Sequence, residues 1–313
     1  MGNQATKDYY AVINTRFTRC LEPSESCQAE PINAHSIQNS RILELLAENG
    51  HVLRFGLKHD RGVPSVSLER VGRNKASTFE GLCSKHDQEI CRPIDTEPVD
   101  LENAEHLFLL AYRSVLRELH TVIQAAVKFH LNFRAAVERG AVRSDIPTPQ
   151  GVAATDWMMN AYDCYEYKKK FDDVLLNDRF DGVEHRSLFF PDAPPSIAVS
   201  ALFSLDDIEW PDDVARIALN VFPVKEGTHV VFSYLSEERP YAHQLLGRIL
   251  EADGYYQRYL ISRLILQNTE NFVLAPAHFG TWSKEKKDAV EKFFLATIME
   301  NNPDHDDPQL YLF

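Results

Sequence analysis

Residues 217–235, with the sequence IALNVFPVKEGTHVVFSYL, decide the fold class of this chain. Two runs rich in β-branched and aromatic residues, Ile217 to Val224 and Thr228 to Leu235, are separated only by the segment 225–227, which ends in glycine. Such runs favour β-strands, and a short connection that contains glycine is typical of a tight hairpin. The sequence therefore predicts an antiparallel β-hairpin, which we take as the centre of a larger sheet.

The sequence on either side of this hairpin extends the same sheet. Upstream, Val183 to Phe190 and Ser196 to Leu205 are predicted as strands, and the proline-rich segment 191–195 predicts a second hairpin between them. Downstream, apolar residues at helical spacing predict helices from Tyr241 to Gln267 and from an N-cap at Ser283 to Glu300, with a short strand from Phe272 to Ala275 between them. The C-terminal part is therefore expected to be an antiparallel sheet covered by helices.

The first part of the chain is polar and rich in turns, and helices follow it. A short helix is expected from Ser40 to Asn49, where Gly50 stands at the C-cap position. Apolar residues three and four apart predict a long amphipathic helix from Leu101 to Gly140 and an antiparallel one from Thr155 to Leu176. We therefore predict an α+β protein with a small zinc-stabilised N-terminal module at 1–95, a helical middle at 96–180 and an α+β domain at 181–313.

Length and composition exclude several classes of protein. The chain has 313 residues, 44% hydrophobic and 25% charged, which excludes disulfide-stapled miniproteins and wholly disordered chains. Five cysteines are too few for a secreted disulfide framework, and Met1 to Tyr10 contain no apolar signal-like run. No stretch approaches the ~18 apolar residues of a membrane span. We therefore expect a cytoplasmic protein without a membrane partner. Glycine-rich phosphate loops and common hydrolase motifs are also missing.

The charge is unevenly distributed. The net charge is −13, but residues 1–93 hold 12 Lys and Arg against 11 Asp and Glu, whereas residues 94–313 hold 21 against 35. One segment is locally basic through Arg54, Lys58, Arg61, Arg70, Arg73 and Lys75. This asymmetry indicates different partners: the N-terminal module could contact nucleic acid, and the acidic C-terminal domain could contact a protein. A solvated loop explains the basic segment equally well. Residues 162–170, which combine tyrosines with lysines, are expected on a solvated helix face.

Cysteine and histidine form the most specific pattern in the chain. Cys20 and Cys27 are separated by six residues, and Cys83 and His86 are separated by two. Three thiolates and one imidazole are a ligand set that tetrahedral structural zinc accepts, and Cys-x2-His is metal-ligand spacing. A metal crosslink would also stabilise a segment that has little apolar material for its own core. We therefore predict a structural zinc site formed by these four residues.

Alternatives to this ligand set stay open. Cys91 could replace one of the four ligands, and His35 could be the fourth ligand instead of His86. Free cysteines are also commonly buried as small hydrophobic side chains, in which case His86 is a polar surface residue. Cys164 lies on the second long helix and is expected in its core.

The same segment resembles the HNH endonuclease superfamily, whose ββα-metal fold is built in many members on a treble-clef zinc scaffold. The string Ala34-His35-Ser36-Ile37 falls on the catalytic-histidine motif of the family, and Gly81-Leu82-Cys83-Ser84-Lys85-His86-Asp87 falls on its closing motif. The resemblance covers about Cys20 to Cys91. It implies that His35 is the general base that activates water, and that Asp87 is a ligand to Mg²⁺ or another catalytic divalent ion beside the zinc. It also implies cleavage of nucleic acid in a bacterial antiviral defence or mobile-element system.

The segment departs from the family pattern at several positions. Ala34 stands where many members have a metal-binding Asp or His, no proline follows His35 at the expected place, and the asparagine of the family name has no secure equivalent. The alternative is a non-catalytic protein-interaction or regulatory subunit whose N-terminal zinc site is structural. A half-buried His35 that is hydrogen-bonded to the backbone fits this alternative.

Overall fold

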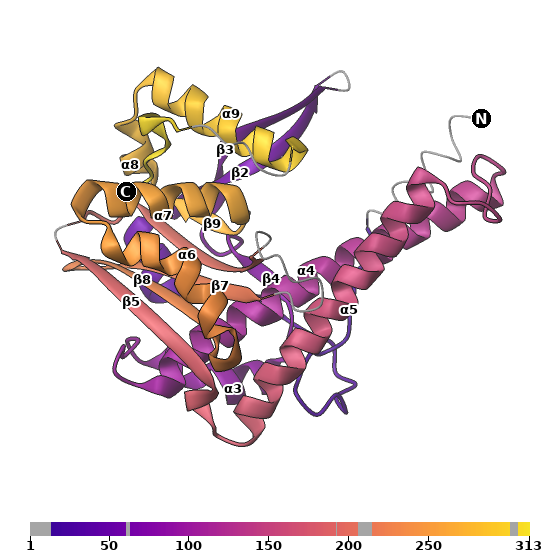
Figure 1. Ribbon diagram of the computed structural model, residues 1–313, viewed down its shortest axis with the longest axis horizontal. Helices are drawn as coiled ribbons and strands as arrows, with labels where there is room; N and C mark the ends of the chain where they lie inside the picture. Colours follow the sequence, from indigo (N-terminus) through magenta and orange to yellow (C-terminus); the bar gives the residue numbers. More distant parts are fainter. Residues whose placement is uncertain (1–13, 61–62, 192, 206–214, 301–305) are drawn as a thin grey trace. The chain divides into compact units, whose positions relative to one another are not determined.

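The computed structural model describes residues 14–60, 63–191, 193–205, 215–300 and 306–313 (Figure 1). Two parts of the sequence analysis lie outside the described residues: the start of the chain, Met1 to Tyr10, which has no signal-like apolar run, and Arg61 of the basic segment. The chain forms two compact units: a smaller one of Met1–Ala34, Phe79–Arg92 and Val115–Arg179, and a larger one of His35–Thr78, Pro93–Ser114 and Phe180–Phe313. Both units combine separated segments. The three continuous ranges expected from the sequence, 1–95, 96–180 and 181–313, stay a prediction.

The larger unit contains a seven-stranded sheet with the strand order β3-β2-β9-β6-β7-β8-β5. The pairs between neighbouring strands are antiparallel. The strands are β2 (His51–Asp60), β3 (Val63–Gly72), β5 (Val183–Pro191), β6 (Ile197–Ser204), β7 (Arg216–Val224), β8 (Gly227–Leu235) and β9 (Phe272–Leu274). The predicted α+β class with a large antiparallel sheet is therefore confirmed.

One of the two predicted hairpins is present and the other is wrong. Strands β7 and β8 pair from Ala218↔Ser233 to Val224↔Gly227, as expected. Strand β5 pairs with β8, in register from Val183↔Leu235, whereas β6 pairs with β7 and β9. Two of the five residues between β5 and β6 are proline, and β5 itself ends at Pro191. Proline does not fit the left-handed positions of tight hairpin turns, so the two strands separate across the sheet.

Strands β2 and β3 form a hairpin that was not predicted from the sequence. They pair continuously from His51↔Gly72 to Asp60↔Val63, and Leu53↔Leu274 joins them to β9. The alternation of apolar residues with arginine, glycine and lysine along 53–58 is the period-two signal of a strand. The basic residues Arg54 and Lys58 in this run favoured the interpretation as a solvated loop instead.

The basic side chains of this hairpin and of the turn after it contact acidic neighbours. Lys58 Nζ lies 2.8 Å from Glu69 Oε1, Arg70 pairs with Glu48, and Arg73 lies 3.8 Å from Glu44 Oε1. These ion pairs reduce the net positive charge that the sequence suggested for a nucleic-acid contact.

Helices cover both faces of the sheet. Helices α6 (Arg239–Glu251), α7 (Gly254–Asn268) and α9 (Lys284–Glu300) pack on one face, in a core that includes Phe232, Leu246, Ile265 and Phe293 (Figure 1). On the other face, Ser114 Oγ lies 3.0 Å from Ser200 Oγ and links the start of α4 (Ala104–Glu138) to β6. The short helices of this unit are η1 (Asn39–Leu43), α2 (Glu44–Leu46), η2 (Phe180–Gly182), η3 (Ser236–Glu238), α8 (Pro276–Gly280) and η4 (Pro308–Leu310).

Several predicted helix boundaries differ from the structure. The helix expected from Ser40 to Asn49 is the pair η1 and α2 and ends at Leu46, because Ala47 is extended. The helix expected from Tyr241 to Gln267 is interrupted before Gly254, which has a φ of 47° and divides it into α6 and α7. Ser283 is confirmed as a cap, because its Oγ accepts a hydrogen bond from Lys286 N at 3.2 Å.

The smaller unit is built mainly from α5 (Pro149–Leu176) and the part of α4 after Val115, which run antiparallel (Figure 1). Helix α5 begins earlier than predicted, because Thr148 Oγ1 accepts a hydrogen bond from Gly151 N and Pro149 occupies the first turn. Helix α3 (Ser84–Thr96) continues into the larger unit. Strands β1 (Asn33–His35) and β4 (Thr78–Glu80) form a two-stranded sheet where the chain passes between the units.

The expected solvated face of residues 162–170 is wrong at Lys168. Its side chain is buried in α5, where Lys168 Nζ donates a hydrogen bond to Asp172 Oδ1 at 2.7 Å. Lys169 and Lys170 are exposed, as expected. Within the described ranges, no helix is both long enough and apolar enough to cross a membrane.

Candidate metal centre

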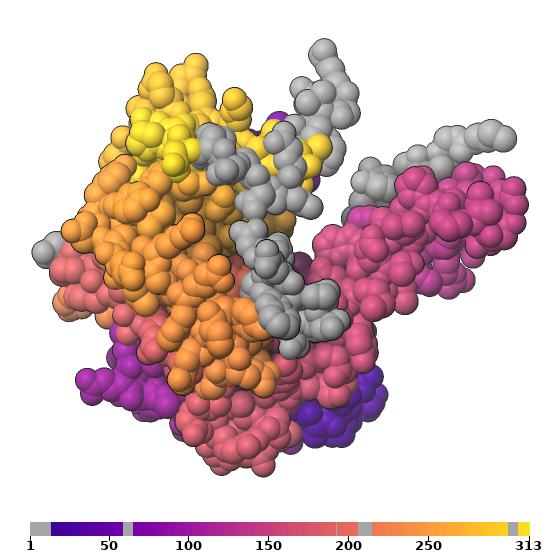
Figure 2. All heavy atoms as spheres, viewed as in Figure 1, coloured from indigo at the N-terminus to yellow at the C-terminus, as the bar shows by residue number. Residues whose placement is uncertain are grey.

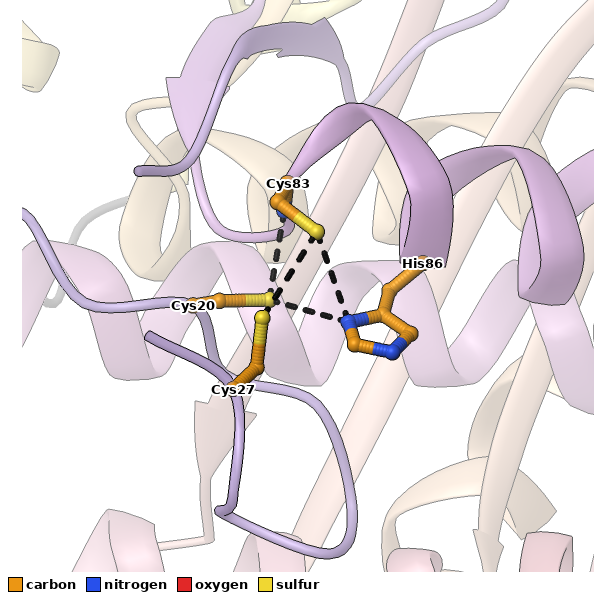
Figure 3. Close-up of side chains that lie close together, drawn as sticks. All are labelled: Cys20, Cys27, Cys83 and His86. Carbon is orange, nitrogen blue, oxygen red and sulfur yellow. Dashed lines mark hydrogen bonds between the residues drawn. The ribbon is translucent and has the colours of Figure 1, made fainter. Parts of the chain in front are cut away.

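Four side chains of the smaller unit form a compact cluster (Figure 3). The ligand atoms of Cys20, Cys27, Cys83 and His86 all lie within 4.8 Å of one another. Cys27 Sγ lies 3.8 Å from Cys83 Sγ, and His86 Nδ1 lies 3.4 Å from Cys83 Sγ and 3.5 Å from Cys20 Sγ. The four residues predicted from their spacing therefore form a Cys3His group that could hold a metal ion such as zinc.

The distances within this group fit a tetrahedral site. With Zn–S bonds of about 2.3 Å and Zn–N bonds of about 2.0–2.1 Å, two sulfurs lie about 3.8 Å apart and a sulfur and a nitrogen about 3.6 Å apart. The three separations given above agree with these edges within about 0.2 Å. These ligand atoms are therefore close enough together to share one four-coordinate metal ion such as zinc.

Helix α3 positions the second pair of ligands. Cys83 directly precedes the helix and its carbonyl accepts a hydrogen bond from Asp87 N at 2.9 Å, which forms the first turn. Residues three apart lie on the same side of a helix, so His86 stands next to Cys83. In Figure 3 the imidazole turns its Nδ1 toward the sulfur atoms.

Backbone hydrogen bonds bring the two pairs together across more than sixty residues of sequence. Leu21 N donates to Gly81 O and Ile32 N donates to Leu82 O, both at 2.8 Å. Cys83 N donates to Cys20 Sγ at 3.2 Å. A hydrogen bond from an amide to sulfur favours the thiolate form, which is the form that binds a metal.

Glu22 holds the loop that carries Cys27. Its buried carboxylate accepts hydrogen bonds from the backbone nitrogens of Ser24 at 2.7 Å, Ser26 at 2.6 Å and Cys27 at 3.0 Å. Burial alone would raise the pKa of Glu22, but the hydrogen bonds from this loop outweigh it and lower the pKa to about 2. Glu22 was not among the predicted site residues. An acidic side chain followed by serines two and four positions later is a local signal for such a loop.

The thiols respond differently to their surroundings. Burial raises the pKa of Cys20 to about 12. Burial also opposes ionisation of Cys83, but hydrogen bonds from the backbone of His86 and Lys85 and from the neighbouring thiols lower the pKa of Cys83. A bound cation deprotonates a coordinating thiol outright, so binding of a metal would reverse the preference of Cys20.

The alternative ligands lie outside this group. Cys91 and Cys164 are each 1% exposed, and Cys164 is in the core as expected. His35 belongs to the larger unit, where its Nδ1 donates a hydrogen bond to Ala76 O at 2.9 Å. Asp87 lies in the first turn of α3, directly after His86, and is not among the four grouped residues.

The polar residues that follow His35 are bound to local structure. Ser36 Oγ donates to Ser77 O at 3.0 Å, and Asn271 Nδ2 donates to Ser36 Oγ at 2.8 Å. Gln38 Nε2 donates to the carbonyls of Ile94 and Asp95 at 3.0 and 3.1 Å. The histidine string therefore anchors its segment within the larger unit, a role that the spacing of the motif does not reveal.

Comparison with known proteins adds no relative. No protein-family model, no curated protein and no solved structure matches the chain. We therefore infer the function of the chain from the geometry of the site and the chemistry of its residues.

Proposed function

We propose that Cys20, Cys27, Cys83 and His86 bind one Zn²⁺ as a structural centre, and that the chain is a non-catalytic interaction or regulatory subunit. The observation that carries this proposal is the closed ligand set: four protein ligand atoms at tetrahedral spacing leave no position for water or substrate. Catalytic zinc sites keep such a position open. The metal would therefore stabilise the fold of the smaller unit.

Three further observations support the non-catalytic role. Ala34, which stands beside His35, has no side chain that coordinates a metal. The polar residues after His35 are hydrogen-bonded within the larger unit. Residues 94–313 carry 35 acidic residues against 21 basic ones, and such a surface suits a protein partner better than a phosphate backbone.

The zinc content of the purified full chain tests the proposal. Native mass spectrometry should find one zinc per chain in the wild type and in Cys164→Ala, whose cysteine is buried outside the cluster. The Cys83→Ala variant should lose the zinc. Wild-type protein that carries no zinc after expression in zinc-supplemented medium would contradict the proposed centre.

A second candidate function is metal-dependent hydrolysis of nucleic acid, and the orientation of His35 favours it. Because Nδ1 donates its proton to Ala76 O, Nε2 is left with a lone pair that can accept a proton from water. Burial lowers the pKa of His35, so the imidazole is neutral at neutral pH. In this candidate function Asp87 holds Mg²⁺ or another divalent ion, and the N-terminal module contacts the nucleic acid.

Cleavage assays with Mg²⁺ or Mn²⁺ separate the two functions. Hydrolysis of single- or double-stranded nucleic acid should be lost in His35→Ala and in Asp87→Ala and retained in His51→Ala, which removes an exposed histidine. Binding should also weaken steeply as salt rises. Absence of cleavage and binding in the wild type removes this candidate, and cleavage that persists in His35→Ala removes His35 from the mechanism.

A further inference from the structure

Cys27 differs from the other cysteines of the chain in its exposure to solvent. It is partly exposed, whereas the other four are each no more than 3% exposed: Cys20, Cys83, Cys91 and Cys164. The residues on both sides of Cys27, 24–26 and 28–30, are exposed as well. In Figure 2 the N-terminal segment, coloured indigo, forms part of the surface on the side shown. A small molecule in solution therefore has its most direct access to Cys27.

Cys83 is the thiol that stands beside Cys27. The Sγ atoms of the two residues lie 3.8 Å apart and are in contact (Figure 3). Cys20 Sγ has other neighbours, because it accepts a hydrogen bond from Cys83 N at 3.2 Å and lies 3.5 Å from His86 Nδ1. The cluster thus places one buried thiol, that of Cys83, directly against the one cysteine that solvent reaches.

An accessible thiolate beside a buried thiol is the arrangement that a hydroperoxide oxidises to a disulfide. The peroxide converts the accessible sulfur to a sulfenic acid, which then condenses with a neighbouring thiol. The thiolate is the reactive form, and a bound zinc ion keeps its cysteine ligands deprotonated. Because Cys27 is only partly exposed, the oxidant must be small. Hydrogen peroxide meets this requirement, and the burial of Cys83 protects the second thiol from direct oxidation.

We propose that Cys27 is an oxidation site, at which hydrogen peroxide converts the metal centre into a Cys27–Cys83 disulfide and releases the zinc. This inference deepens the proposed function and rests on it, because it requires zinc to be bound by the four residues of the cluster. It adds a chemical signal to which the centre responds.

The oxidation has two steps. In the first, the thiolate of Cys27 attacks one oxygen of the peroxide, the O–O bond breaks, and a sulfenic acid and a hydroxide ion form. In the second, the thiolate of Cys83 attacks the sulfur of Cys27, the S–S bond forms, and the S–O bond breaks with release of a second hydroxide ion. The two sulfurs lose two electrons in total and the peroxide gains them. Both hydroxide ions take up protons from the solution and become water.

The disulfide changes the metal content of the smaller unit while it keeps the unit crosslinked. Only Cys20 and His86 remain as ligands, and structural zinc requires four. The disulfide joins residues 20–34 to residues 79–92, which are the segments that the zinc ion joins. Because a covalent crosslink restricts the unfolded chain, the oxidised protein should stay folded without its metal. A reductant and zinc should then restore the original centre.

Treatment of the zinc-loaded full chain with a small molar excess of hydrogen peroxide tests the proposal. A colorimetric indicator should report release of the zinc, and peptide mapping by mass spectrometry without reduction should find Cys27 linked to Cys83. Dithiothreitol and added zinc should reverse both changes. Zinc that stays bound, or a disulfide between other cysteines, would overturn the proposal and leave the zinc centre in place. Reduced wild-type protein without zinc would instead remove the proposed centre itself.

Two matched variants test the role of Cys27. Cys27→His and Cys20→His each leave two cysteines and two histidines, which structural zinc accepts, and the zinc content of both is measured before peroxide is added. Cys27→His lacks the accessible thiol and should release zinc about tenfold more slowly than the wild type. Cys20→His keeps Cys27 and Cys83 and should release zinc at the wild-type rate. Equal rates in the two variants would contradict the role of Cys27, and the disulfide map of the wild type decides the matter if either variant fails to bind zinc.

Discussion

The buried carboxylate of Glu22 holds the loop that positions Cys27, one of the four candidate metal ligands. Three backbone nitrogens of the Ser24–Cys27 loop donate to its carboxylate, so the position of Cys27 depends on the charge of Glu22. Glu22→Gln replaces charge-assisted hydrogen bonds with weaker ones and should lower the free energy of unfolding by about 1–3 kcal/mol. Release of zinc to a chelator, followed with a colorimetric zinc indicator, should be faster in this variant. Glu30→Gln, an exposed change in the same segment, should have no effect.

The same residue predicts the acid sensitivity of the smaller unit. The pKa of Glu22 is lowered from 4.5 to about 2, so its contribution is fully present above pH 4.5 and is lost as the pH falls toward 2. Chemical denaturation of the wild type should show a loss of stability across this range. The loss should be smaller in Glu22→Gln, and equal slopes in the two proteins would contradict the role of the carboxylate.

The buried pair of Lys168 and Asp172 provides a second prediction at the residue scale. Their side chains are 2% and 6% exposed in α5. Lys168→Met removes the ammonium group that hydrogen-bonds to the buried Asp172 carboxylate, and it should lower the free energy of unfolding by about 3–5 kcal/mol. The double variant Lys168→Met with Asp172→Leu should recover most of that loss. A double variant as unstable as the single one would show that packing, and not the charge, sets the cost.

At the scale of elements, Gly227 is decisive for the hairpin that defines the sheet. A Cβ at this position would lie 2.2 Å from Phe190 O on the neighbouring strand β5. Gly227→Ala therefore forces β5 and β8 apart and should reduce the free energy of unfolding by more than about 2 kcal/mol. Gly247→Ala in α6 meets no atom within 4 Å and should be neutral or stabilising by up to about 1 kcal/mol. Unfolding curves of the two alanine variants, measured in parallel, test this contrast.

Local patterns were sufficient to predict the main helices and five strands of the fold. The long helix expected from Leu101 to Gly140 is α4, and the strand from Ile217 to Val224 is β7 with one further residue at its start. Pairing between distant strands could not be predicted in this way. The partner of β5 is β8 because of the whole sheet arrangement, and neither strand carries a local signal for the other.

In the candidate site, too, the local features could be predicted from the sequence and the long-range contacts could not. The spacing of Cys83 and His86 was informative, because two ligands on one helical turn are close in space as a consequence of their closeness in sequence. The approach of Cys20 to Cys83 depends on backbone hydrogen bonds at Gly81 and Leu82, and these bonds leave no pattern in the sequence. The burial of Lys168 likewise depends on tertiary packing, so a helical wheel alone placed it on the solvated face.

At the scale of the whole molecule, the two units differ in what stabilises them. The larger unit has a continuous apolar core of sheet and helix residues, including Val221, Phe232 and Ile265, each fully buried. The smaller unit combines two long helices with the irregular segment that carries Cys20 and Cys27. Burial of apolar surface therefore stabilises the larger unit, whereas the proposed metal centre would add a crosslink between distant segments of the smaller unit.

Removal of the metal should consequently affect the two units differently. Hydrogen exchange measured by mass spectrometry, with and without a zinc chelator, should show faster exchange at residues 20–34 and 79–92, because loss of the crosslink frees the segments it joins. Exchange in β6, β7 and β8 should change little, because those strands are held by their own core. Re-addition of zinc should restore protection, which separates metal loss from irreversible unfolding. An equal rise of exchange throughout both units would mean that they unfold as one cooperative body, and the metal centre would then stabilise the entire chain.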